Sequence, residues 1–122
     1  MRKFIRGFGF AAKGVSYAFR SQLNFRVHCV LAVVTVIFGL ALHISAAEWC
    51  WVALCIGLVL SAELLNTSIE ALTDLVSPGF NEKAGLVKDA AAAAVLITAF
   101  FSLVIGCIIF LPKLYALICH AA

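Results

Sequence analysis

The residues best able to do chemistry lie in one run of otherwise apolar sequence. Their spacing follows the 3.6-residue period of an α-helix, which places them on a single stripe about 100° wide. The members of this stripe are Glu63, Asn66, Thr67, Glu70 and Asp74. On a helix the stripe would rise about 16 Å along the axis. Carboxylate and amide oxygens are ligands that Mg²⁺ accepts, and a carboxylate can also take up a proton.

The chain around the stripe has the composition of a membrane protein. Of its 122 residues 65% are hydrophobic and only 12% are charged, whereas a soluble domain is roughly half apolar and a quarter charged. A domain this short buries only ~60–70% of its unfolded surface, so the apolar excess is expected to face lipid. A carboxylate at the centre of a membrane helix costs ~2.5–3.5 kcal/mol. The solvent-exposed end of a helix would explain Asp74 and Glu70. It would not explain Glu63, which has Leu64, Leu65 and Ile69 near it in the sequence.

Four helical segments are expected to position the stripe. Residues 3–20 place basic side chains opposite aromatic ones with helical periodicity, which suits a helix lying in the headgroup layer. Apolar runs long enough to span a membrane cover residues 27–44, 48–76 and 88–111. Basic residues gather before the first run and in the loop before the third, so the N-terminus is expected in the cytoplasm. The prediction is one all-α integral membrane domain, residues 1–122, with an N-terminal amphipathic surface helix and three transmembrane helices.

Two kinds of chemistry suit a carboxylate stripe in a membrane. In phosphoryl transfer, acidic residues hold the Mg²⁺ of a nucleotide, a lysine neutralises phosphate charge and a carboxylate accepts the proton of the attacking hydroxyl. In proton-coupled transport, a membrane glutamate exchanges a proton for a cation. Lys88 and Asp89, at the start of the third run, are the nearest additional charged residues. The residues alone leave both readings open, together with a non-catalytic membrane assembly protein.

Two sequence blocks resemble those of a known family. Residues 62–75, AELLNTSIEALTDL, look like the signature helix of the prokaryotic diacylglycerol kinase family, and residues 85–97, GLVKDAAAAAVLI, look like its second block. Ala12-Lys13-Gly14 and Asn24-Phe25-Arg26 resemble weaker N-terminal landmarks. The similarity extends over roughly residues 8–113. The runs NFRVH at 24–28 and IFLPK at 109–113 look closer to the undecaprenol kinase branch.

The resemblance implies a particular enzyme. It would be a homotrimeric, multi-pass lipid kinase of the bacterial inner membrane, dependent on Mg²⁺ and ATP and active in phospholipid metabolism. Its sites would be shared between neighbouring subunits, and it would have no nucleic-acid partner. The acceptor would be diacylglycerol or undecaprenol, and the sequence leaves the choice between them open.

The resemblance also assigns roles to individual residues. Glu63 would be the catalytic base toward the lipid hydroxyl, and Glu70 would bind the metal. Residues serving the nucleotide and the cleft would be Lys13, Asn66, Asp74, Lys88 and Asp89. At the position of Gln22 the family usually carries a second metal-binding glutamate. A glutamine amide can donate one oxygen to the metal but lacks the charge, so we expect weaker metal binding here.

Overall fold

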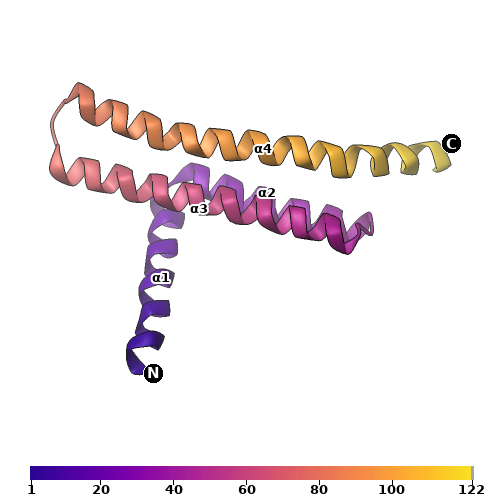
Figure 1. Cartoon of the computed structure of the whole chain (residues 1–122), viewed down its shortest axis with the longest axis horizontal. Coiled ribbons are helices and arrows are strands. Elements are labelled where there is room, and N and C mark those ends of the chain that lie inside the picture. Colours follow the sequence, from indigo (N-terminus) through magenta and orange to yellow (C-terminus); the bar gives the residue numbers. More distant parts are fainter. Residues whose placement is uncertain (122) are drawn as a thin grey trace.

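The computed structural model describes residues 1–121, and all of its secondary structure within them is helical (Figure 1). The helices are α1 (Arg2–Ser21), α2 (Leu23–Ala41), α3 (Ala46–Val76) and α4 (Glu82–Ala121). Three of them, α2, α3 and α4, are long and apolar enough to cross a membrane. The predicted all-α integral membrane fold is therefore confirmed.

The three long helices lie side by side, and α1 projects away from them (Figure 1). Helix α3 packs against both α2 and α4 and is antiparallel to each. Gln22 separates α1 from α2 because its backbone is extended, with φ −112° and ψ 118°. If the three long helices span a bilayer, α1 would lie along the membrane surface, where its amphipathic sequence is favoured. That surface location, and the membrane limits within the long helices, stay predictions.

The turn between α2 and α3 is fixed by a capping box. The Ser45 hydroxyl accepts a hydrogen bond from the Glu48 backbone N–H at 3.3 Å, and the Glu48 carboxylate accepts one from the Ser45 N–H at 2.7 Å. These bonds satisfy amide groups that the first turn of a helix leaves unpaired. Lys113 of α4 lies 3.2 Å from the same Glu48 carboxylate. This end of the bundle is therefore held by polar contacts around an apolar core.

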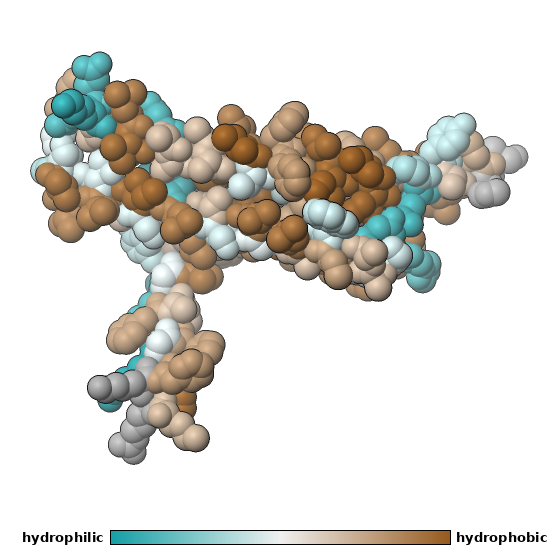
Figure 2. All heavy atoms as spheres, viewed as in Figure 1, coloured by the Kyte–Doolittle hydropathy of each residue, from teal (hydrophilic) through white to brown (hydrophobic). Residues whose placement is uncertain are grey.

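The core at this end of the bundle consists of buried side chains from α3, from α4 and from the turn between α2 and α3. Its members are Ile44, Val52 and Ile109, with Trp49 packed against them. Apolar residues cover the middle of the visible face, and polar residues gather toward the two ends of the bundle (Figure 2). An apolar belt between polar ends is the surface expected of a protein surrounded by lipid.

Gly39 allows α2 to approach Trp49 closely, and this contact yields a prediction. A Cβ at position 39 would lie 2.8 Å from the Trp49 ring and 3.1 Å from Ile44 Cδ1. Overpacking of this kind costs about 1–3 kcal/mol, so Gly39→Ala should unfold at a lower SDS concentration in mixed micelles. Gly57→Ala is the matched control, because a Cβ there has no neighbour within 4 Å. Equal stability of the two variants would contradict this packing.

Candidate active site

Glu63 lies at the deep end of the polar stripe, on the side of α3 that faces α2. Its side chain is 2% exposed. The antiparallel packing of α2 on α3 brings His28 Nε2 to 3.3 Å from Glu63 Oε1. This oxygen has no hydrogen-bond partner within the described residues, so the imidazole lies close to the carboxylate without a hydrogen bond of normal geometry between them. His28 was not predicted to belong to the site, although a polar residue inside an apolar run is a usable signal.

Glu70 lies two turns further along α3 and accepts hydrogen bonds on both carboxylate oxygens. Asn66 Nδ2 donates to Oε1 at 2.9 Å, and Gln22 Nε2 donates to Oε2 at 2.7 Å. The first bond follows from the four-residue spacing on one helix face. The second joins α3 to the break between α1 and α2. Gln22 therefore reaches the predicted partner, with its amide donating to the carboxylate.

Asp74 and Lys88 form the end of the site nearest the α3–α4 connection. Lys88 Nζ donates to Asp74 Oδ1, and both side chains are partly or largely exposed. Solvent-exposed ion pairs contribute only about 0–1 kcal/mol to stability. The contact therefore orients Lys88 near the polar stripe, while the ion pair adds little to the stability of the fold.

Two of the predicted site residues make no such contacts. Lys13 is exposed on α1, where its Nζ lies 5.9 Å from the centroid of the Phe10 ring. It borders a shallow hollow along α1 together with Tyr17 and Arg20. Asp89 is exposed and has no hydrogen bond or ion pair among residues 1–121. A single copy of the chain thus brings together Gln22, His28, Glu63, Asn66, Glu70, Asp74 and Lys88, in the contacts described above. We call this set the polar track.

The oxygen atoms around Glu70 suit a magnesium ion that arrives with phosphates. Besides the carboxylate, Asn66 Oδ1 is buried without a hydrogen-bond partner in the described part of the chain. Gln22 faces Glu70 with its Nε2 donor, so its amide would have to turn over to offer an oxygen to the ion. Within residues 1–121 no three His, Cys, Asp or Glu side chains are grouped so that they could hold a metal by themselves. Mg²⁺ commonly uses one or two carboxylates and takes its other ligands from substrate phosphates and water. The residues therefore fit this ion.

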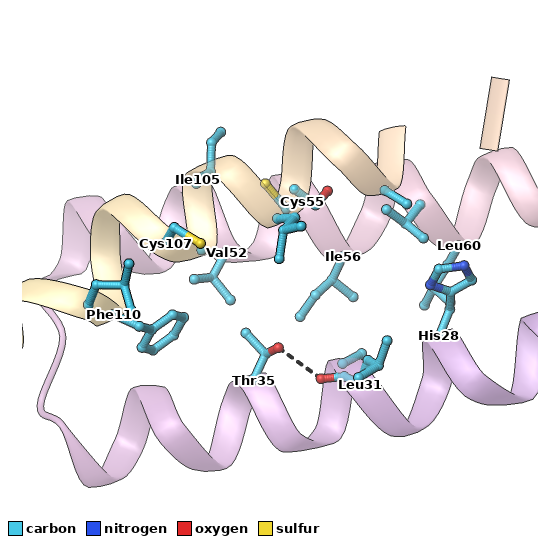
Figure 3. Close-up of a pocket in the computed structure, with 17 residues that line it drawn as sticks. His28, Leu31, Thr35, Val52, Cys55, Ile56, Leu60, Ile105, Cys107 and Phe110 are labelled. Carbon is cyan, nitrogen blue, oxygen red and sulfur yellow. Dashed lines mark hydrogen bonds between the residues drawn. The ribbon is translucent and has the colours of Figure 1, made fainter. Parts of the chain in front are cut away.

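An apolar groove begins beside the polar track at His28 and extends along the bundle in the direction away from Glu70 and Asp74 (Figure 3). It has a volume of about 540 Å³ and lies between α2 and α4, with α3 as its floor. His28 marks one end and Phe110 the other, and its walls include Leu31, Ile56 and Ile105. The sequence did not predict this groove, because it depends on how far apart α2 and α4 lie.

Comparison with known proteins places the chain among membrane kinases. The family model described as prokaryotic diacylglycerol kinase matches residues 9–110. The chain is 40% identical to the undecaprenol kinase of Bacillus subtilis over 114 residues, which is 93% of each chain. It is 40% identical over 111 residues to the diacylglycerol kinase of Synechocystis, covering 90% of this chain and 63% of that one. Identity to the diacylglycerol kinase of Escherichia coli K12 is 29% over 107 residues, 88% of each.

The Gln22–Glu70 contact predicts a dependence of stability on divalent cations. Gln22→Glu would place a second carboxylate where Gln22 now donates to Glu70 at 2.7 Å. Two carboxylates at that separation repel unless a proton or cation intervenes. The variant should therefore unfold in mixed micelles at a lower SDS concentration than the native protein in EDTA, and regain stability in millimolar Mg²⁺. Gln22→Ala, which adds no charge, is the control. The same Mg²⁺ response in all three proteins would argue against a metal-binding role for this pair.

Proposed function

The chain belongs to the prokaryotic diacylglycerol kinase family and is a lipid kinase, and we propose that it transfers the γ-phosphate of ATP to the hydroxyl of a membrane lipid. The observation that carries this proposal is the junction of the polar track with the apolar groove at Glu63 and His28. The alternatives, a proton-coupled transporter and a non-catalytic assembly protein, do not agree with membership of a kinase family.

The acceptor is proposed to be diacylglycerol or undecaprenol, the two lipids after which the related kinases are named. Each has one hydroxyl group and at least one long hydrocarbon chain. The groove between α2 and α4 is mostly apolar and ends at the polar track. A hydrocarbon chain lying in it would bring the lipid hydroxyl to the His28 end, beside the buried carboxylate. The groove supports a lipid acceptor of either kind.

The phosphate side of the reaction is assigned to the rest of the polar track. Glu70, with the amide oxygens of Asn66 and Gln22, would hold Mg²⁺, whose charge offsets that of the phosphates when it is bound. Lys88 would lie against the nucleotide phosphates, and Asp74 orients it through their ion pair. Lys13 and Asp89 are proposed to serve the nucleotide and the cleft. The lipid oxygen attacks the phosphorus itself, so no protein nucleophile is needed.

The proposed setting is a homotrimer in the bacterial inner membrane with the N-terminus in the cytoplasm. The distribution of basic residues supports this orientation. Self-association is supported by the polar track, because Glu70 is only half-buried and Asp74 is exposed on a single copy of α3. Ionisable residues on spanning helices normally face other helices or water rather than lipid. Neighbouring copies would cover this face and complete a shared site, which is where Lys13 and Asp89 could act.

The reaction is tested with purified protein, γ-labelled ATP, Mg²⁺ and micelles that contain either diacylglycerol or undecaprenol. Labelled phosphate should appear on at least one of the two lipids. Glu63→Gln keeps the size of the side chain but removes its basicity, so kcat should fall by ~10²–10⁴-fold, with little change in the KM for ATP. The α2–α3 turn variant His43→Asn is the control and should retain native kcat. No labelled lipid with either acceptor, or a Glu63→Gln variant within a few-fold of native, would contradict the proposal.

A further inference from the structure

Helix α1 carries basic side chains in a straight line along its polar face. Arg6, Lys13 and Arg20 are seven residues apart, so neighbouring members are offset by only about 20° around the helix and by about 10 Å along it. All three are exposed, and none forms an ion pair with a carboxylate in the described part of the chain. We call these three residues the cation row.

The end of the cation row nearest α2 borders a hollow of about 470 Å³. The hollow is lined by Lys13, Ser16, Tyr17, Arg20 and Ser21. These side chains offer ammonium, guanidinium and hydroxyl groups, and no carboxylate is among them. The Ser21 hydroxyl already donates to the Tyr17 backbone carbonyl at 2.8 Å. Charged N–H donors of this kind make short, strong hydrogen bonds to phosphate oxygens, so the hollow suits a phosphate group.

The opposite face of α1 indicates where that phosphate comes from. Phe4, Phe8 and Val15 lie on this face and are exposed, and the rings of Phe4 and Phe8 pack edge to face with centroids 5.2 Å apart. A helix with an aromatic face and a basic face is stable in the headgroup layer, with its cations at the level of the lipid phosphates. The chemistry of the row therefore matches the headgroups of anionic phospholipids.

A nucleotide at the polar track does not account for the whole cation row. Helix α1 ends beside Gln22, which donates to Glu70 at 2.7 Å. At 1.5 Å per residue, Arg6 lies about 24 Å along the helix from Gln22. A nucleotide held at Glu70 is too far from Arg6 to use its charge. The outer part of the row needs another anion, one that is present along the full length of α1.

We propose that the cation row binds the headgroups of anionic phospholipids on the membrane surface where α1 lies, with one phosphate in the hollow beside Arg20. Lipids bound there hold α1 against the membrane. Because Gln22 directly follows α1, they also fix the residue that donates to Glu70. The inference concerns a lipid-binding surface and does not depend on the proposed phosphoryl transfer.

The binding is measured by hydrogen–deuterium exchange of the whole protein in two kinds of lipid nanodisc. One contains phosphatidylcholine alone, and the other contains phosphatidylcholine with one part in three of phosphatidylglycerol. Helix α1 projects from the bundle (Figure 1), so exchange of its amides reports its contact with the membrane. Each cation near an anionic surface contributes about fivefold to binding, so phosphatidylglycerol should slow exchange in α1 by ~10–100-fold. Exchange in α3 should be the same in both membranes.

The double variant Arg6→Gln, Arg20→Gln tests the cation row and leaves Lys13 in place. With one cation left, phosphatidylglycerol should slow exchange in α1 by only about fivefold. Lys83→Gln is the matched control, because Lys83 is an exposed cation at the start of α4, away from α1. This variant should keep the full native response. Salt at 1 M, where screening acts over about 3 Å, should abolish the response of the native protein without any substitution.

Three results would overturn the inference. One is equal exchange of the native α1 in the two membranes, and another is a double variant that responds as strongly as the native protein. The third is slowing of the same size in phosphatidylcholine alone on addition of inorganic phosphate or Mg-ATP, which would make the row a site for soluble anions. Native exchange in α3 shows that each variant is folded, and the salt response of the native protein decides the question if the double variant is not.

Discussion

Glu63 is 2% exposed on a membrane-spanning helix, and its carboxylate lies 3.3 Å from the imidazole of His28 on the neighbouring helix. Placing a carboxylate at the centre of a membrane-spanning helix costs ~2.5–3.5 kcal/mol. Removing the partner of a carboxylate that is also buried between helices costs more. The contact therefore decides which face of α2 meets α3. Once that face is set, the start of α2 brings Gln22 to Glu70, and the antiparallel α4 brings Lys88 to Asp74.

A lipid kinase must bring together a water-soluble nucleotide and an acceptor that stays in the bilayer. The arrangement of the chain suits both requirements, because two paths meet at one point. The polar track leads from Glu63 toward the exposed end of α3, where oxygen ligands and Lys88 are suited to phosphates. The apolar groove leads from His28 in the opposite direction, among residues suited to hydrocarbon. A reaction at the junction therefore requires neither the nucleotide to enter the apolar groove nor the lipid chain to enter the polar track.

Much of this could be predicted from the sequence, because helical periodicity fixes which residues of one helix share a face. That argument places Glu63, Asn66, Glu70 and Asp74 together without any knowledge of packing. It cannot say which residue of another helix lies opposite, since that depends on how the helices pack. His28 was missed for this reason, as was the donation from Gln22 to Glu70 that satisfies the carboxylate without a metal. Lys13 and Asp89 remain predictions, because neither has a partner from the polar track within residues 1–121.

The claim that the contact between His28 and Glu63 sets the packing of α2 on α3 is tested most directly by a double-mutant cycle of stability. The measurement is the SDS concentration at half-unfolding in mixed micelles for the native protein, His28→Ala, Glu63→Gln and the double variant. Residues in contact show non-additive effects. The account predicts that the double variant is less destabilised than the two single losses added together. If the two losses simply add, the residues contribute independently and the account is contradicted.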